Sequence, residues 1–498
     1  MNYVLGIDIG TTHCKAVALA SDGVLLYECK SNYPTIQELP GQSEQDAAGV
    51  FNTMLNVLQQ AVASMKGHSL DAVCFSTAMH SVMAVDKQGT PLTNAYTWAD
   101  TRSNEIADLL RGLPNAIAIY NRTGTPIHPM SPLCKIAWIK KEMPQVFDAV
   151  GKFISIKEYI FHKLFDKYLI DHSIASATGL FDIHSLQWCD EALEAAGVST
   201  EKLSVPVPVT HVETGLKKEY GKLLGIKETV PFIIGASDGC LANIGCGAMG
   251  KGEAALTIGT SGAVRLVVDK PHADPQQRLF NYILSDRLYV TGGPVSNGAA
   301  ALKWFGENFL QRNFSSPADL EWILNLAKQS PAGAEGLLFL PYLSGERAPF
   351  WDASARGAFI GLQMAHRKEH LARAVVEGIS FGLYQVMQAV EESNGPIEKI
   401  YASGALVQST FWLQLVADMF NKSITVSATA DASAVGAALL ALHVTGTIPR
   451  IEDSKQFIPE GETYRPEKKM HDIYARHFDI YKGLYPKLKD DFKNLNTE

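Results

Sequence analysis

One short stretch near the N-terminus brings together a carboxylate, a glycine, two hydroxyls and a lysine. It reads Asp8-Ile9-Gly10-Thr11-Thr12, and Lys15 follows three residues later. A glycine lets the backbone turn tightly and approach a ligand closely, and exposed N–H groups with hydroxyls can hold phosphate oxygens. Asp8 would repel a bare phosphate, so it fits only with a cation between them, and Mg²⁺ keeps several waters in such sites. The stretch predicts a phosphate turn with water-bridged Mg²⁺ at Asp8, against the alternative of an ordinary β-hairpin turn.

A second stretch far downstream repeats part of this chemistry. Thr257 to Gly262 presents Gly259, Thr260 and Ser261 after an apolar, strand-like run, with no acid at the position of Asp8. Two such turns facing each other across a cleft could hold both ends of a triphosphate. A similarity this short does not establish a duplication, and a loop of small residues used for packing is the alternative.

A carboxylate also follows an apolar run in the middle of the chain. Asp238 comes directly after Phe232 to Ser237, and the carboxyl ends of strands are where α/β sheets place their ligands. There it could accept the proton of an attacking hydroxyl during phosphoryl transfer. Judged from composition alone, a helix N-cap is the more common role for an aspartate in this position.

The segment GCGAMGKG, residues 245–252, imitates a nucleotide-binding loop. It matches G-x-x-x-x-G-K, but Gly252 stands where a serine or threonine should hold Mg²⁺. It also follows a predicted helix and precedes a predicted strand, the reverse of the required order. We therefore expect a turn or hinge at this glycine cluster.

The elements that must position these residues alternate in the α/β manner. The predicted strands are Tyr3–Ile7, Ala72–Ser76, Phe232–Gly235, Glu253–Ile258, Arg287–Thr291 and Lys399–Ser403. The predicted helices are Asp46–Met65, Ser131–Lys141, His370–Glu391 and Thr410–Asn421. A boundary near residue 246 places one phosphate turn in each half, so we expect two domains, 1–246 and 247–498.

Composition excludes several classes of protein. The 498 residues are 46% hydrophobic and 19% charged with a net charge of −8, which is globular and offers no basic surface for nucleic acid or membrane. The N-terminus lacks the pattern of a signal peptide. Seven cysteines stand singly, without a C-x-x-C pair, which argues against structural zinc and favours a reducing cytoplasm. The composition is compatible with a homodimer.

Two longer stretches resemble the FGGY carbohydrate kinases, a branch of the actin/hexokinase-type ATPases. The first is Met130 to Ile139, with its Pro, Lys and Trp at the expected spacing, and the second runs from Gly357 to Glu377. The resemblance spans almost the whole chain. It implies an α/β protein of two actin/hexokinase-like (ribonuclease H-like) domains around a central cleft, acting on ATP with Mg²⁺.

The resemblance also assigns roles to single residues. It implies that Asp238 is the catalytic base, close to substrate and metal, and that Asp8 lies at the metal. The residues it implies for ATP are Gly10, Thr11, Thr12, Lys15, Gly259, Thr260, Ser261, Gly298, Lys303, Gly404, Ala405 and Gln408. The stretch Ser403-Gly404-Ala405 has fewer glycines than the family pattern. Lys135 and Trp138 are expected to be structural, on one face of a helix.

The acceptor side of the resemblance is less specific. Met79 and His80, and the Trp98-x-Asp100-x-Arg102 stretch, lie where relatives contact the sugar. A core histidine and a surface Asp100–Arg102 pair, which would contribute little, are the alternatives. The segment from Asp171 and His172 to Asp182 looks most like bacterial gluconate kinases, and a carboxylate on the substrate would need a cation or oriented donors. His80, Arg102 and His172 are the candidates for that contact.

Three functions follow for comparison. The first is phosphorylation of D-gluconate to 6-phospho-D-gluconate, and the second is a kinase for xylulose or another ketose or polyol. The third is a nucleotide-gated binding protein of the actin or chaperone kind, which the stretch around Lys135 and Trp138 argues against.

Overall fold

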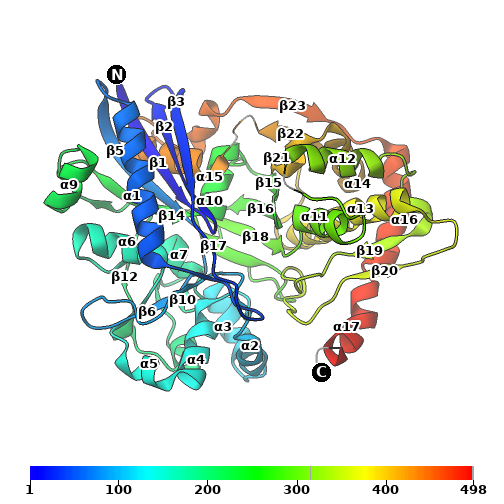
Figure 1. Cartoon of the computed structure of the whole chain (residues 1–498), viewed down its shortest axis with the longest axis horizontal. Helices are drawn as coiled ribbons and strands as arrows, with labels where there is room; N and C mark the ends of the chain where they lie inside the picture. The colour runs from blue at the N-terminus through cyan, green and yellow to red at the C-terminus, as the bar shows by residue number, and fades with distance from the viewer. Residues whose placement is uncertain (315, 428, 430, 496–498) are drawn as a thin grey trace.

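The computed structural model describes residues 1–314, 316–427, 429 and 431–495, which form two large mixed sheets side by side (Figure 1). The first sheet has the order β13-β14-β5-β1-β2-β3. Its strands are β1 (Asn2–Ile9), β2 (His13–Ala20), β3 (Leu25–Asn32), β5 (Ser69–Thr77), β13 (Val212–Glu213) and β14 (Phe232–Ser237). The second sheet has the order β17-β18-β16-β15-β21-β22-β23. Its strands are β15 (Glu253–Ile258), β16 (Gly262–Val268), β17 (Phe280–Ile283), β18 (Tyr289–Val295), β21 (Lys399–Gly404), β22 (Ser423–Ser427) and β23 (Glu460–Tyr464).

Both sheets repeat one strand pattern. In the first, β3, β2 and β1 alternate in direction, while β1, β5 and β14 run parallel. In the second, β18, β16 and β15 alternate, while β15, β21 and β22 run parallel. The β1–β2 and β15–β16 hairpins therefore occupy equivalent places, and their connections carry the two predicted phosphate turns. The short similarity in the sequence reflects a repeated architecture.

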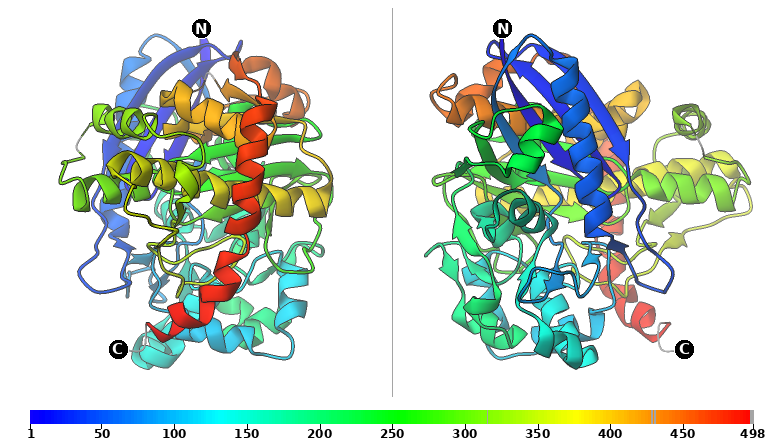
Figure 2. Two further views of the ribbon diagram at one scale, coloured as in Figure 1. Left: turned by 90° about the vertical axis from the view of Figure 1, so that its right-hand side faces the viewer. Right: turned by 60° about the vertical axis from the view of Figure 1, so that its left-hand side comes forward.

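Helices cover both sheets (Figures 1 and 2). Those before residue 247 are α1 (Ala47–Ser64), α2 (Asn104–Arg111), α3 (Ala116–Thr123), α4 (Pro132–Glu142), α5 (Pro144–Ala149), α6 (Ile156–Phe165), α7 (His172–Ser176), α8 (Asp190–Ala196), α9 (Lys218–Leu224) and α10 (Asp238–Cys246). Those after it are α11 (Ala299–Asn308), α12 (Pro317–Ala327), α13 (Lys368–Asn394), α14 (Thr410–Phe420), α15 (Ala432–Val444), α16 (Lys468–Tyr481) and α17 (Leu484–Asn494).

Short strands complete the two halves. Between the strands of the first sheet lie β4 (Glu44–Gln45), β6 (Met83–Val85), β7 (Ala95–Tyr96), β8 (Lys152–Ile154), β9 (Leu169–Asp171), β10 (Phe181–Asp182), β11 (Gln187–Trp188) and β12 (Val205–Val207). Several of them form, with α2 to α7, the lower part of the N-terminal half in Figure 1. In the C-terminal half, β19 (Leu338–Leu340) pairs with β20 (Ala358–Ile360).

The two halves meet where α10 crosses α15. A Cβ atom on Gly245 would lie 1.8 Å from the carbonyl oxygen of Ala432, and one on Gly436 would lie 2.0 Å from that of Leu241. Only glycine permits this approach of the two backbones. Helix α15 also packs against β1, β2 and β5, on the face of the first sheet opposite α1. The expectation of a hinge is therefore wrong at Gly245, which lies inside α10, while Gly247 and Gly252 adopt positive φ in the turn that follows.

The predicted elements agree closely with the observed ones. The strand expected from Arg287 begins at Tyr289, and the helix from Thr410 is capped by Ser409, whose side chain accepts from the Trp412 N–H. Lys135 is 1% exposed, and its Nζ donates to the carbonyl oxygens of His80, Thr97 and Met130 at 3.1, 2.7 and 2.5 Å. This confirms its structural place. Trp138 is only half-buried, edge-on to Tyr96.

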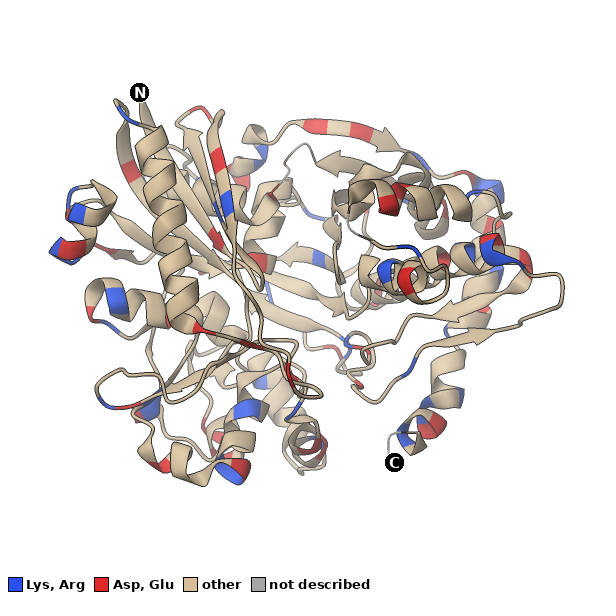
Figure 3. Ribbon diagram, in the orientation of Figure 1, with Lys and Arg blue, Asp and Glu red and all other residues tan. Residues whose placement is uncertain are grey.

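The molecular surface is mixed in charge. Figure 3 shows lysine, arginine, aspartate and glutamate interspersed on the outer helices in that view. Among the described residues, no helix is both long and apolar enough to cross a membrane.

Candidate active site

The first turn is held rigidly by side chains from neighbouring elements. The Gly10 N–H donates to the His13 carbonyl oxygen at 2.9 Å, which closes the hairpin. Gln45 Nε2 donates to the Thr11 carbonyl oxygen at 2.7 Å, and Trp98 Nε1 donates to Thr11 Oγ1 at 3.0 Å. Thr12 is exposed at the tip. The turn is therefore a β-hairpin turn, which was the alternative interpretation of the sequence. It also carries the two predicted hydroxyls, those of Thr11 and Thr12.

The second turn is built from three chain segments at one end of the second sheet. The N–H groups of Gly298 and Ala299 donate to the carbonyl oxygens of Thr260 and Gly259 at 2.9 and 2.8 Å. A Cβ atom on Gly298 would lie 2.5 Å from the Ser261 carbonyl oxygen. Gly404 is the register partner of Ile258 at the end of β21. The predicted residues Gly259, Thr260, Ser261, Gly298 and Gly404 therefore come together.

The remaining residues predicted for ATP are spread along neighbouring helices. Ala405 and Gln408 begin and end the short helix η3 (Ala405–Gln408) directly after Gly404, and Gln408 is exposed. Lys303 lies in α11, with its side chain 57% exposed and 3.7 Å from Glu307. Its ammonium group is therefore not fixed toward the second turn.

Asp238 stands where β14 gives way to α10. The cap of that helix is Ser237, whose hydroxyl accepts from the Cys240 N–H at 3.4 Å, so the capping role considered for Asp238 belongs to its neighbour. The Asp238 carboxylate accepts from the Gly239 N–H at 2.7 Å, and the residue is half-buried. Burial raises the pKa of Asp238, while the positive charge of Arg265 favours its ionised form.

Carboxylates converge between the two halves around Asp8. Ser76 Oγ donates to Asp8 at 2.6 Å, and Lys15 of β2 forms an ion pair with Asp431 at the start of α15. Burial, together with the negative charges of Asp431 and Asp238, raises the pKa of Asp8 to about 8. Such crowding of negative charge is what a bound cation relieves. No cluster of three or more metal-ligating side chains exists among the described residues.

The acceptor side begins at Met79 and His80, just beyond β5. A Cβ atom on Gly239 would lie 2.9 Å from Met79 Cε and 3.1 Å from Arg265 Nε, so both side chains flank Asp238. His80 has φ of 67°, and its Nδ1 lies 2.7 Å from the Ala177 carbonyl oxygen. Burial lowers the pKa of His80 to about 3, and nearby Lys135 adds to the effect. Neutral His80 cannot supply a positive charge.

Asp100 and Arg102 form a buried cluster behind Trp98, in place of the surface pair considered from the sequence. Asp100 is 2% exposed and accepts from Arg102 Nε at 3.1 Å. Arg102 also pairs with Glu44 at 2.5 Å and lies 5.1 Å from the ring centroids of Tyr96 and Trp138. The charge of Arg102 is already compensated, so it does not fit as the cation for an acidic substrate.

Asp171 lies behind the site, not in it. It is fully buried, pairs with Lys157 at 2.7 Å, and caps α7 by accepting from the Ile174 N–H at 2.9 Å. His172 is 8% exposed beside Phe181, and burial lowers its pKa. Neither residue presents a charge to the acceptor side, which differs from the expectation.

Two arginines of the C-terminal half enter the site without having been predicted. Arg265 is the one charged residue within the apolar strand β16, and Arg347 follows β19. The Arg347 guanidinium carbon lies 4.4 Å from the centroid of the Trp98 ring. The sequence could have indicated Arg265 as a site residue, because it is a single charged residue within an apolar strand. Arg347 was assigned no role from the sequence, because its contact with Trp98 joins segments far apart in the chain.

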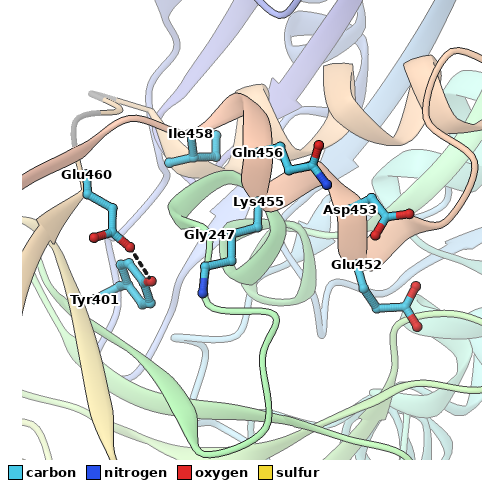
Figure 4. Close-up of a pocket in the computed structure, with 8 residues that line it drawn as sticks. All are labelled: Gly247, Tyr401, Glu452, Asp453, Lys455, Gln456, Ile458 and Glu460. Atoms are coloured by element: carbon cyan, nitrogen blue, oxygen red, sulfur yellow. Dashed lines mark hydrogen bonds between the residues drawn. The ribbon is translucent and has the colours of Figure 1, made fainter.

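One cavity lies away from the residues described above. It measures about 420 Å³ and is lined by Gly247, Tyr401, Glu452, Asp453, Lys455, Gln456, Ile458 and Glu460 (Figure 4). It contains none of the predicted site residues. We therefore place the candidate active site at Asp238 and the two turns.

Comparison with known proteins agrees with this geometry. Residues 3–245 match the FGGY family of carbohydrate kinases, N-terminal domain, and residues 254–444 match the C-terminal domain. Gluconokinase of Bacillus subtilis strain 168 is 41% identical over 470 residues, covering 93% of this chain and 91% of that protein. The solved structure of ligand-bound xylulose kinase from Lactobacillus acidophilus has a TM-score of 0.94 at 34% identity, covering 100% of both chains. That of gluconate kinase from the same organism has a TM-score of 0.93 at 35% identity, covering 99% of this chain and 100% of that one. This chain belongs to the FGGY family of carbohydrate kinases.

Proposed function

We propose that this protein transfers the γ-phosphoryl group of ATP to D-gluconate, giving 6-phospho-D-gluconate. The observation that carries the proposal is the position of Asp238, half-buried at the end of β14 and close to Asp8 of the first turn and Arg265. The 41% identity to the Bacillus subtilis gluconokinase supports gluconate as the acceptor.

Asp238 acts as the general base in this proposal. Its carboxylate takes the proton of the substrate hydroxyl at C6 as that oxygen attacks the γ-phosphorus in line with the departing oxygen of ADP. The Gly239 N–H orients the carboxylate, and the charge of Arg265 favours its ionised form against the effect of burial on its pKa. Most of the remaining contribution is positioning, because phosphoryl transfer needs little further covalent chemistry from the protein.

The two turns hold the triphosphate in this proposal. Gly10, Thr11, Thr12 and Lys15 face one side, Gly259, Thr260 and Ser261 face the other, and Gly298, Gly404, Ala405 and Gln408 lie toward the nucleoside. Asp8 and Asp238 would hold Mg²⁺, which supplies charge neutralisation on the phosphate oxygens when bound. The crowded carboxylates at Asp8 support this assignment.

A coupled ADP-release screen across gluconate, xylulose, ribulose and glycerol tests the acceptor. We expect gluconate to give the highest kcat/KM. The second candidate is xylulose, favoured by the similarity to the Lactobacillus acidophilus xylulose kinase, and a preference for xylulose with gluconate near background would replace the first proposal. A slow ATPase rate that is unchanged by any of these sugars would instead indicate a nucleotide-gated binding protein.

A further inference from the structure

Arg347 is a deeply buried charge with no carboxylate partner. It is 7% exposed, and no carboxylate of the described residues lies within ion-pair distance of its guanidinium. Arg373 provides the comparison, because it is 6% exposed and pairs with Glu377 at 2.6 Å. A buried charge is costly unless it is paired and hydrogen-bonded. The Arg347 guanidinium therefore keeps the capacity to form an ion pair with a further anion.

The hydrogen bonding of Arg347 is also incomplete. Its Nη2 donates to the Val295 carbonyl oxygen at 2.9 Å, while Nε has no partner among the described residues. A guanidinium offers five N–H donors in a planar fork suited to carboxylates. The neighbouring Glu346 makes no ion pair with the guanidinium: its Oε1 accepts from the N–H groups of Ser296 and Arg347 at 2.5 and 2.8 Å, and its buried Oε2 has no partner among the described residues.

The contact with Trp98 places Arg347 on the acceptor side of the cleft. The guanidinium covers the Trp98 ring at 4.4 Å, and the indole N–H of the same ring donates to Thr11 in the first turn. Trp98 comes from the N-terminal half and Arg347 from the C-terminal half. The pair therefore spans the cleft beside the first turn and fixes the orientation of the guanidinium.

Arg265 and Arg347 both bring positive charge to Asp238, but they make different contacts. Arg265 Nε approaches Gly239, and its charge is the strongest of those that favour ionised Asp238, whereas the effect of Arg347 is the weaker of the two. In gluconate the carboxylate is at the opposite end of the carbon chain from the C6 hydroxyl that must reach Asp238. Arg347, whose guanidinium lies over the Trp98 ring and not against Gly239, is the cation suited to that carboxylate.

We propose that Arg347 binds the carboxylate of the sugar-acid substrate and thereby selects acids over neutral polyols. This rests on the proposed function, and it replaces His80, Arg102 and His172, whose charges are absent or already paired. Arg347 is a binding and specificity residue in this proposal, while the chemistry stays with Asp238.

The test compares Arg347→Gln and Arg347→Lys with the wild type, using gluconate and its neutral counterpart D-glucitol. We expect Arg347→Gln to lower kcat/KM for gluconate about 10- to 100-fold, as for loss of a hydrogen bond to a charged group. The kcat/KM for D-glucitol should change little, so the ratio of kcat/KM for gluconate to that for D-glucitol should fall. Arg347→Lys should recover part of the loss with gluconate. Calorimetric titration with gluconate alone should show weaker binding by a similar factor.

Arg312→Gln is the matched control, because Arg312 covers the Trp322 ring at the same 4.4 Å, away from the site. It should leave both acceptors unchanged. Equal losses with gluconate and D-glucitol in a folded Arg347→Gln protein would overturn the inference and show a purely structural role. Unaltered gluconate binding would overturn it too, and a wild type inactive on gluconate would instead defeat the proposed function.

Discussion

Asp238 and Asp8 are both buried or half-buried acids, yet their surroundings suit them to different work. Asp238 is oriented by one backbone N–H and faced by Arg265, which favours the ionised form that a base needs. Asp8 is crowded by Asp431 and Asp238, which favours its protonated form until a cation arrives. The same side-chain type thus supports two roles through its neighbours.

Changing Asp238 to Asn keeps the shape of the side chain and removes the basic oxygen. A positioned general base contributes about 10²–10⁴-fold, so kcat should fall by at least about a hundredfold. Affinity for ATP should change little, because the residues proposed near the nucleoside lie in the other half. Steady-state kinetics and nucleotide titration measure the two effects, and a variant keeping more than about a tenth of wild-type kcat would refute the base assignment.

Asp8→Asn tests the metal assignment. A metal ligand must lose its proton before binding, and the pKa of Asp8 is raised to about 8. The Mg²⁺ concentration for half-maximal rate should therefore fall in the wild type as pH rises through about 8. The Asn variant should need more Mg²⁺ and should lose this pH dependence. Equal Mg²⁺ requirements in both proteins at every pH would argue that Asp8 is not a ligand.

At the scale of elements, α4 is anchored through Lys135. Three carbonyl oxygens surround its Nζ, which matches the three N–H donors of an ammonium group, although burial lowers the pKa of Lys135. Lys135→Met removes the donor from three buried carbonyl oxygens, of which, among the described residues, only that of Thr97 keeps another partner, the Asp100 N–H. The free energy of unfolding should fall by about 2 kcal/mol or more. Chemical denaturation measures the loss.

Trp138→Ala is the companion variant on the same helix. Because the ring is half-buried against Tyr96, the loss should be smaller than the about 3–5 kcal/mol typical of a fully buried tryptophan. An unchanged melting temperature together with lost binding of the acceptor would contradict the structural role and show that Trp138 contributes to substrate recognition.

The close crossing of α10 and α15 predicts that adding one methyl group at Gly245 destabilises the protein. Gly245→Ala would place its Cβ within 1.8 Å of the Ala432 carbonyl oxygen, and such overpacking costs about 1–3 kcal/mol. Gly382→Ala in α13 is the control, since its Cβ would meet nothing closer than 3.7 Å. That variant should be neutral or stabilised by about 0.5–1 kcal/mol. Similar thermal melting of the two variants would contradict the tight crossing.

The sequence was informative wherever neighbours along the chain determine the outcome. Periodicity and turn residues predicted β1, β15 and their hairpin turns, and Asp238 follows β14 as expected. It was uninformative where contacts join distant segments. Arg347 meets Trp98 from across the cleft, and the charge of Arg102 is cancelled by Glu44, 58 residues away. Neither pairing leaves a periodic or local signal in the chain.

At the scale of the whole molecule, each half contributes one hairpin turn and part of the acceptor side. We propose the boundary between domains 1–246 and 247–498 because α10 ends at Cys246 and the second sheet begins at Glu253. The halves contact each other through α10 with α15, through Lys15 with Asp431, and through Trp98 with Arg347. The first of these contacts is rigid backbone packing, whereas the other two are side-chain contacts that a ligand can rearrange.

The final prediction is closure of the two halves around both substrates. The γ-phosphoryl group can be held from both sides only when the two turns approach each other, and closure excludes the water that would otherwise hydrolyse ATP. Small-angle scattering with gluconate and a non-hydrolysable ATP analogue should give a smaller radius of gyration than the free protein. Asp238→Asn with ATP itself offers an independent closed complex, because its chemistry is blocked. Either ligand alone should produce less compaction than the pair, since each then lacks contacts from one half. An identical radius for the free protein and both complexes would show that the halves do not close, and the exclusion of water would then have to come from side chains alone.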